Sequence, residues 1–534
     1  MKGAGLLCAL PFLATACAAQ TAGTGSIGGS ISGLVRDAAT GAPVADAEVS
    51  LRLRNGSSVA ARVDAQGQYA FTGLPPGTYR VNASAPVEKG LTLPPQQDKT
   101  VTLRTGQTLT SVDLRLPSMG VIGGRVLDES EEPVSGARVV LVDKRYDHGE
   151  LRYPLAAWTQ TDEAGVYRLT GVPAGEVFLV ETQAPRTTAP GVSAADTFYP
   201  QALSAELAVE IAIAPGEMRS GVDIHRAKLP AYCVDGMVEG APESALDLEV
   251  RDAVVVNNSP YPSQHNSAGK TKPDGTFRIC GLHRGQYLFT ANGSSPGAGQ
   301  PPFLAAGTLE VTDGDVRDFK LLPAVMSPVS AEFVWDGDPS PNTPGLSGAV
   351  SLQGRRGGVQ VSFGFGGTGS LSRVAMLPAD DYTVDLHAIS AGWYAKSVTC
   401  GGRSVLHGVG PLGGAASCGA LRFVFAHDGG SLTARVADKD GDPIPDAYVA
   451  IIPEWAATEA EMSAMMTFGQ TGPNGVYSAS VLPPGKYRVL ATNETIDLAA
   501  NRIARLWAAQ SRGQEVEIGV NASPQVKLEL QSLR

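Results

Sequence analysis

Apolar and polar residues alternate in short segments along most of this chain. In residues 31–37, 47–53, 122–128, 137–141 and 447–451, apolar side chains stand largely at every second position. Successive side chains of a β-strand point to opposite faces of the sheet, so this period of two predicts strands with one buried and one wet face. Gly- and Pro-containing turns join these segments without intervening helices, which predicts antiparallel pairing.

A glycine-containing box recurs along the chain. Its first copy runs over residues 64–79 and holds two glycines, Gly67 and Gly77, that are ten positions apart. The same interval returns at Gly165 and Gly175, Gly275 and Gly285, and Gly475 and Gly485, with a degraded copy at residues 377–382. A repeat of this kind predicts an array of small units that each bury a core of their own.

We therefore predict an all-β chain of five tandem Ig-like or transthyretin-like β-sandwiches, each made of two facing antiparallel sheets. The 63 glycines and 37 prolines among 534 residues suit a chain of many strands and turns. The last sandwich is expected to hold one or two short helices, over residues 501–507 and within 454–466. The predicted sandwiches cover residues 27–117, 118–228, 229–325, 326–427 (a divergent copy) and 428–534.

Residues 1–19 are interpreted as a signal peptide for export. Lys2 precedes an apolar run over residues 6–13, and small residues follow it. Two processing routes are open: cleavage after Ala16 or Ala19, or attachment of a lipid to Cys17. The mature protein is expected in the periplasm, at the outer membrane or outside the cell, with contact to a membrane only through such a lipid.

Four further cysteines fall in two pairs, each within one repeat. Because an exported protein meets an oxidising compartment, we expect one disulfide between Cys233 and Cys280 and another between Cys400 and Cys418. A metal site is the weaker alternative, since no Cys-x-x-Cys spacing occurs.

The formal net charge of −11 is spread over the chain without a basic block. Binding of nucleic acid calls for clustered Lys and Arg side chains, so nucleic acid is not an expected partner. No cofactor is expected either.

The repeated residues resemble a known family. The succession Gly-x-Val-x-Asp, Pro-Val-x-x-Ala-x-Val, Asp-x-x-Gly-x-Tyr and Leu-Pro-Pro-Gly-x-Tyr is similar to the carboxypeptidase regulatory-like domain, a transthyretin-like sandwich that is also grouped with carbohydrate-binding-like folds. The similarity is strong in the first two units and poor in the fourth. In metallocarboxypeptidases this domain accompanies a separate zinc-binding catalytic domain. No histidine here has a glutamate three positions later, so the resemblance implies a chain that is not an enzyme.

The second unit carries the densest aromatic segment. A sugar ring stacks its apolar face on Trp or Tyr, so Tyr146, Tyr153 and Trp158 are candidate ligand-binding residues. The alternative is a long loop whose aromatic rings cover the edge of the sandwich. Trp393 and Trp455 are isolated in the sequence, and both are expected to cover the core or a sheet edge.

A weak calcium candidate lies near the start of the fifth unit. Asp438, Asp440 and Asp442 supply the carboxylates that Ca²⁺ prefers. Pro443 follows them directly, which fits a plain hairpin turn equally well.

The leading functional hypothesis is a non-enzymatic binding or scaffold protein outside the cytoplasm. Its expected partner is a glycan or a cell-envelope protein, and carbohydrate binding through the sandwich loops follows only from the family resemblance. The first alternative is a spacer or adhesin stalk that binds protein partners. A further alternative is an accessory protein of a peptidase system.

Overall fold

The fold is described from a computed structural model of the chain. It describes residues 28–38, 40–52, 58–84, 96–116, 119–174, 177–183, 190–252, 269–293, 303–336, 345–355, 359–367, 371–414 and 418–533. The signal peptide and Cys17 lie outside these residues.

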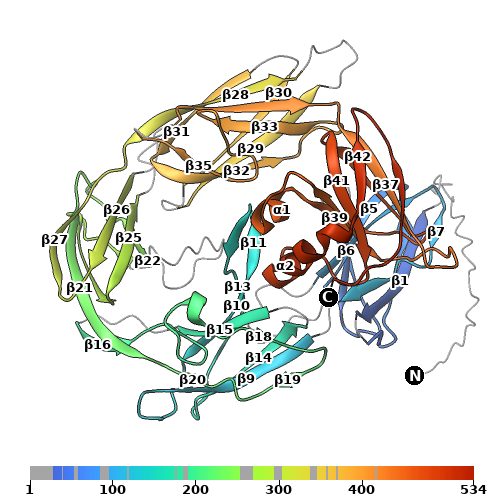
Figure 1. Ribbon diagram of the computed structural model, residues 1–534. Helices are drawn as coiled ribbons and strands as arrows, with labels where there is room; N and C mark the ends of the chain where they lie inside the picture. Colours follow the sequence, from blue (N-terminus) through green and yellow to red (C-terminus); the bar gives the residue numbers. More distant parts are fainter. Residues whose placement is uncertain are drawn as a thin grey trace, which may run out of the picture. The chain divides into compact units, whose positions relative to one another are not determined.

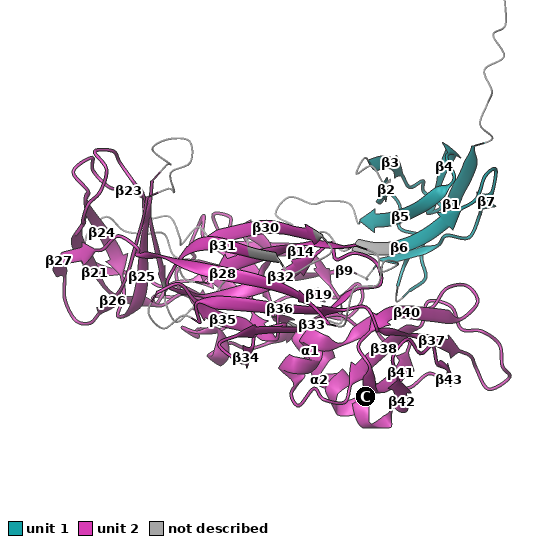
Figure 2. Cartoon of the chain, turned by 90° about the horizontal axis from the view of Figure 1, so that it is seen from above, with its two compact units in different colours: residues 1–87, 94–118 teal, residues 88–93, 119–534 magenta. Residues whose placement is uncertain are grey.

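The chain divides into two compact units (Figure 2). Residues 1–87 and 94–118 make up the first unit, and residues 88–93 and 119–534 make up the second. The first unit holds one β-sandwich, and the second holds four. None of the described helices combines the length and apolar character that crossing a membrane would require.

The first sandwich pairs the sheet β4-β1-β7, with β8 also on β1, with the sheet β3-β2-β5-β6. Ile31, Val35, Val49 and Leu51 point into its core and are fully buried. Its strands are β1 (Gly29–Asp37), β2 (Glu48–Arg52), β3 (Ser58–Arg62), β4 (Gln68–Leu74), β5 (Gly77–Ser84), β6 (Gln96–Leu103), β7 (Thr108–Leu109) and β8 (Leu114–Leu116).

The second sandwich repeats this arrangement with the sheets β14-β9-β19 and β13-β10-β15-β17, and adds a small separate hairpin, β11-β12. Its elements are β9 (Met119–Leu127), β10 (Arg138–Asp143), β11 (Arg145–Asp147), β12 (Glu150–Arg152), β13 (Leu155–Gln160), β14 (Val166–Pro173), β15 (Val177–Gln183), β16 (Gly191–Ala194), β17 (Thr197–Phe198), η1 (Ala205–Leu207), β18 (Ile211–Ala212), β19 (Met218–Arg219) and β20 (Ile224–His225).

The third sandwich is built from the sheets β16-β21-β24, with β27 on β21, and β23-β22-β25-β26. Strand β16 lies within the second sandwich in the sequence, but it pairs with β21 of the third. The two sandwiches therefore share a strand at their junction. The strands are β21 (Lys228–Val238), β22 (Asp247–Asp252), β23 (Gly269–Lys270), β24 (Thr276–Leu282), β25 (Gly285–Asn292), β26 (Leu304–Val311) and β27 (Val316–Leu321).

The fourth sandwich, whose sequence is the most divergent, keeps two facing sheets, β31-β28-β36-β33-β34 and β30-β29-β32-β35. Phe333, Phe365, Phe423 and Phe425 stack in its core, with ring centroids 4.6 to 6.4 Å apart. The strands are β28 (Met326–Trp335), β29 (Leu346–Gly354), β30 (Gln360–Gly367), β31 (Leu371–Pro378), β32 (Asp380–His387), β33 (Tyr394–Cys400), β34 (Arg403–Ser404), β35 (Val409–Leu412) and β36 (Ala420–Ala426).

The fifth sandwich has the sheets β40-β37-β43 and β39-β38-β41-β42, and two short helices pack beside it (Figure 1). Both helices fall where the sequence predicts them. The elements are β37 (Gly430–Val436), β38 (Tyr448–Pro453), α1 (Glu459–Met465), β39 (Thr467–Gln470), β40 (Val476–Leu482), β41 (Gly485–Thr492), α2 (Ala500–Ala509), η3 (Gln510–Arg512), β42 (Gln514–Ile518) and β43 (Gln525–Leu528).

The predicted all-β architecture of tandem sandwiches is confirmed, with one addition. Most pairs are antiparallel, but in each sandwich the first strand also pairs in parallel with a late strand, as β1 does with β8 and β37 with β43. A parallel pair needs a long crossover connection, and here the strands that lie between the first and the late strand in the sequence form that connection.

The repeated box forms a tight turn that its own aspartate caps. Asp64 Oδ1 accepts hydrogen bonds from the backbone N–H groups of Gln66 (2.9 Å) and Gln68 (2.7 Å). Gly67 follows with φ +80°, a conformation that L-residues with a side chain rarely adopt. The same bonds recur at Asp162 in the second sandwich. The box is thus a structural turn that starts the next strand.

Two neighbouring glycines of β9 allow a direct test of close packing. A Cβ atom at Gly124 would lie 2.0 Å from the carbonyl oxygen of Val222, whereas a Cβ atom at Gly123 would meet its nearest neighbour at 3.4 Å. We expect Gly124→Ala to lower the unfolding free energy of the second sandwich by about 3 kcal/mol, because backbone atoms must shift. Gly123→Ala is the matched control and should cost little. Equal losses in urea unfolding of the two variants would contradict this account.

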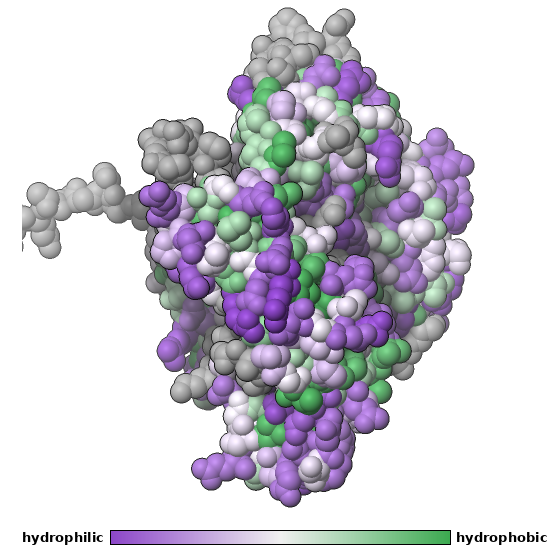
Figure 3. All heavy atoms as spheres, turned by 90° about the vertical axis from the view of Figure 1, so that its left-hand side faces the viewer, coloured by the Kyte–Doolittle hydropathy of each residue, from purple (hydrophilic) through white to green (hydrophobic). Residues whose placement is uncertain are grey.

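The described surface carries large apolar residues scattered among polar ones. On the face drawn in Figure 3, hydrophobic and hydrophilic residues are interspersed. Single exposed apolar side chains are normal on the surface of folded proteins.

Candidate functional site

The aromatic segment of the second sandwich folds into a projecting hairpin. Strands β11 and β12 pair antiparallel, with Tyr146 opposite Leu151. The two residues between the strands, His148 and Gly149, have φ +51° and +73°, which is the turn that a two-residue hairpin favours. We call residues 145–152 the clasp hairpin, because the hairpin contacts two other sandwiches.

One set of contacts joins the clasp hairpin to the fifth sandwich, and Figure 1 shows β11 beside α1. The backbone N–H of Tyr146 donates to the carbonyl of Leu498 at 2.8 Å, and the N–H of Ala500 donates to the carbonyl of Lys144 at 2.8 Å. The Tyr146 ring packs against the apolar cluster around α1 and α2. Its hydroxyl lies 3.3 Å from Glu459 Oε2. Tyr146 is therefore an anchor between sandwiches.

A second set of contacts joins the clasp hairpin to the fourth sandwich. His148 Nε2 contacts Asp385 Oδ1 on β32, and Arg355 Nη1 lies 2.7 Å from Glu150 Oε1. The two residues of the first pair are 237 positions apart in the chain. The hairpin thus ties the second, fourth and fifth sandwiches together.

Charge pairing at the base of the clasp hairpin is partly buried. Glu150 Oε2 lies 2.6 Å from Arg152 Nη2, and the Arg152 side chain is only 4 % exposed. Within the described residues, Arg152 Nε and Nη1 are buried without a hydrogen-bond partner. A buried cation is costly unless a carboxylate pairs with it. Glu150 therefore stabilises Arg152 of the second sandwich and also pairs with Arg355 of the fourth.

The other two aromatic candidates of this segment lie elsewhere on the sandwich. Tyr153 packs against Val140, Val142 and Leu179 on the outer face of its own sheet. Trp158 is 39 % exposed, and the guanidinium carbon of Arg138 lies 4.9 Å from its ring centroid. Tyr146, Tyr153 and Trp158 therefore do not form one platform, and their role as ligand-binding residues stays a prediction.

The charges around His148 raise its pKa to about 10, from an ordinary value of 6.5. The main cause is the Asp147 carboxylate, 2.8 Å from Nδ1, followed by Asp385 on the fourth sandwich, while burial opposes the rise. His407, also on the fourth sandwich, interacts electrostatically with His148. At neutral pH His148 is therefore a cation between two carboxylates.

We expect this charge to make docking of the clasp hairpin depend on pH. Because the folded-state pKa lies above the unfolded one, the stabilisation is complete below about pH 6.5 and is lost as the pH rises through about 10. NMR titration of the seven histidines should show one that titrates near pH 10, absent in His148→Gln and shifted down in Asp385→Asn. A His148 that titrates near 6.5 would refute the ion pair.

The calcium candidate adopts the geometry of a capped turn. Asp438 Oδ1 accepts from the backbone N–H groups of Asp440 (3.0 Å) and Asp442 (2.9 Å), as Asp64 does in the first box. Among the residues that the structure describes, no three His, Cys, Asp or Glu side chains gather as a metal site would need.

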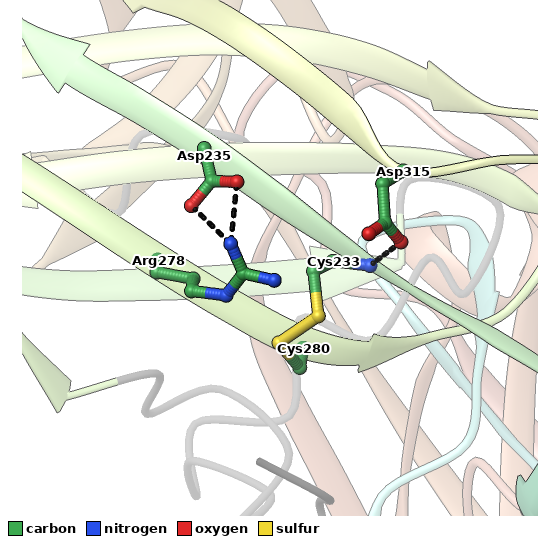
Figure 4. Close-up of a disulfide and its surroundings, with 5 residues drawn as sticks. All are labelled: Cys233, Asp235, Arg278, Cys280 and Asp315. Carbon is green, nitrogen blue, oxygen red and sulfur yellow. Dashed lines mark hydrogen bonds and ion pairs between the residues drawn. A yellow bond between two sulfur atoms is a disulfide. The ribbon is translucent and has the colours of Figure 1, made fainter. Parts of the chain in front are cut away.

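Both predicted disulfides are present. Cys233 on β21 is bonded to Cys280 on β24, and Cys400 on β33 is bonded to Cys418. Figure 4 shows that the first lies beside the ion pair of Asp235 with Arg278, on the same two strands. The backbone N–H of Cys233 also donates to Asp315 Oδ1 at 2.9 Å, next to β27. These interactions fasten the three strands of one sheet in the third sandwich.

Comparison with protein families supports the resemblance in the first two sandwiches. Residues 30–117 and 121–194 match the family of the carboxypeptidase regulatory-like domain. The chain therefore carries two tandem segments of this type, as their sequence pattern predicts. No curated protein sequence matches the chain.

Several solved structures of bacterial proteins show a distant similarity. A streptococcal ancillary pilin is 13% identical and matches over 55% of this chain and 99% of its own, with a TM-score of 0.20. A minor pilin of Streptococcus agalactiae is 14% identical over 38% of this chain and 96% of its own, with a TM-score of 0.23. The TIE protein of Bacillus anthracis is 12% identical over 91% of this chain and 68% of its own, with a TM-score of 0.15. At these TM-scores the similarities carry no argument about function.

Sequence reasoning missed the polar residues of the clasp hairpin. The dipeptide His148-Gly149 between two short alternating segments was an available hairpin signal. Asp385 and Arg355 carry no such signal, because nothing in their own neighbourhood points to a partner in another repeat.

Proposed function

We propose that this chain is an exported, non-enzymatic scaffold that binds a partner outside the cytoplasm. The observation that carries the proposal is the clasp hairpin, which joins the second sandwich to the fourth and fifth by backbone hydrogen bonds and by the ion pairs of His148 and Glu150. A simple spacer needs contacts only between successive domains. Contacts between domains that are distant in the sequence instead fix the positions of their loops relative to one another. A binding surface built from several domains requires such fixed positions.

Export is supported by the two disulfides, which persist in oxidising compartments. We place the protein in the periplasm, at the outer membrane or outside the cell, after removal of residues 1–19 or attachment of a lipid at Cys17. The intact mass of the mature protein distinguishes these routes, since a diacylglyceryl group adds a defined mass to a chain that starts at Cys17. If a Cys17→Ala variant stays in the membrane fraction, the lipid anchor is ruled out.

The proposed ligand is a carbohydrate. Exposed indole rings support this choice, because Trp158 and Trp455 are 39 % and 48 % exposed, and a sugar ring stacks on such surfaces. The competing hypothesis, a stalk that binds an envelope protein, requires no exposed indole.

The test is a glycan array probed with the full mature chain, followed by thermal shift on each hit. A glycan that raises the melting temperature supports the binding function, because a ligand that binds only the folded state stabilises it. A negative array together with a specific envelope protein that co-purifies would replace the carbohydrate by a protein partner.

A further inference from the structure

A cleft between the fourth and fifth sandwiches has the size and lining of a ligand site. Its volume is about 620 Å³, within the range of roughly 300–1,000 Å³ that small-molecule sites occupy. The fourth sandwich contributes Tyr394, Lys396 and Ser404, and the fifth contributes Trp455 and Tyr487. We call it the Trp455 cleft.

Trp455 is the exposed aromatic surface of this cleft. It lies two residues after the end of β38, and 48 % of it is exposed, whereas Trp393 is only 5 % exposed and fills the core. The expectation that both tryptophans cover the core or a sheet edge holds for Trp393, and Trp455 rests on Gly485 and Tyr487 of β41 while 48 % of it stays exposed. A half-exposed indole that lines a cleft is available for stacking.

The indole of Trp455 is held in a fixed position. Its ring meets the Tyr487 ring edge to face, with centroids 5.1 Å apart and planes at 72°. A Cβ atom added to Gly485 would lie 2.5 Å from Trp455 Cζ3, so the indole rests directly on this backbone. At the equivalent glycines of the first and third boxes, Gly77 and Gly285, the nearest atom would be 3.9 and 3.7 Å away. In the fifth sandwich, the missing side chain of the box glycine Gly485 thus leaves room for the indole of Trp455.

Polar groups of both charges surround this ring. The Tyr394 hydroxyl donates to Asp428 Oδ1 at 2.9 Å, and Lys396 pairs with Asp336. The lining holds one lysine and one aspartate, with Ser404 and His407 beside them. The single lysine is already paired with Asp336, so an anionic ligand would find no excess positive charge here, while a hydroxylated neutral ligand would find donors and acceptors around an apolar face.

We propose that the Trp455 cleft binds a neutral carbohydrate, with one sugar ring stacked on Trp455 and its hydroxyl groups directed to Asp428 and Lys396. This inference rests on the proposed carbohydrate-binding function and adds the site and the charge class of the ligand. Because two sandwiches line the cleft, its shape depends on how they are held, and the clasp hairpin contacts both of them.

The experiment uses the full mature chain and three variants on an array of neutral and acidic oligosaccharides, with affinities of the hits measured by calorimetry. Trp455→Ala removes the stacking surface, and Trp455→Phe keeps a smaller one. Met376→Ala is the matched control, since it removes a large apolar side chain of similar exposure (49 %) from the fourth sandwich, outside the cleft. Melting temperatures establish that each variant is folded.

We expect neutral glycans as hits, a loss of affinity of about tenfold or more in Trp455→Ala, partial recovery in Trp455→Phe, and no change in Met376→Ala. Binding that Trp455→Ala leaves intact would overturn the cleft as the site while the carbohydrate-binding function stands. Hits confined to acidic glycans would overturn the neutral ligand class. If no glycan binds the unaltered chain, the proposed carbohydrate-binding function is refuted, and this inference is refuted with it.

Discussion

Replacing Glu150 with glutamine is expected to destabilise the docked clasp hairpin by about 3 kcal/mol, the lower end of the cost of leaving a buried charge unpaired, because Arg152 is buried while Glu150 is 32 % exposed. Glu150 bridges Arg152, whose side chain is 4 % exposed, and Arg355 of the fourth sandwich. The neutral amide keeps the shape of the side chain and removes its charge. The buried Arg152 guanidinium then loses the carboxylate that it pairs with and keeps only the charge interaction with Asp147, and undocking of the hairpin would let water reach it.

Hydrogen exchange of the backbone amides in residues 145–152 and in α1 measures this docking directly, because local opening exposes those amides. Glu249→Gln is the matched control. Glu249 pairs with Arg251 at 2.7 Å over the same two-residue spacing, but the Arg251 side chain is 26 % exposed. A more exposed pair contributes less, so the control should cost about 1 kcal/mol or less. If both variants lost the same stability, the burial of Arg152 would not be what makes Glu150 important.

Removal of the disulfide between Cys233 and Cys280, by alanine at both positions, is expected to lower the stability of the third sandwich by about 4 kcal/mol. The two cysteines are 47 residues apart, and a cross-link over a loop of this length restricts the unfolded chain considerably. The bond between Cys400 and Cys418 spans only 18 residues, so its removal should cost the fourth sandwich about 3 kcal/mol.

Because the sandwiches need not unfold together, the measurement must be local. Hydrogen exchange in β21 and β24 reports on the third sandwich, and exchange in β33 and β36 reports on the fourth. Each double variant should affect its own sandwich most. A loss of protection that spreads equally over all sandwiches of the second unit would mean that they unfold as one body.

Local and short-range features could be predicted from the sequence. The period of two predicted the strands, since a strand such as β1 needs only its own alternation to choose a buried face. Asp64 and Gly67 predicted the turn of the box, because both act within five residues. The disulfides followed from the pairing of cysteines within one repeat.

The sequence by itself thus determined the class of fold, the turns, the two helices and the cysteine pairs of this protein, because each of these depends on neighbouring residues or on the repeat. Only the tertiary structure decided which strands pair in parallel, that Tyr146 and His148 bind other sandwiches, and that Trp455 lines a cleft. The alternation of apolar residues specifies which face of a strand is buried but not what covers it. A contact such as that between His148 and Asp385 joins two polar residues across 237 positions, and neither the period nor the repeat leaves any sign of it.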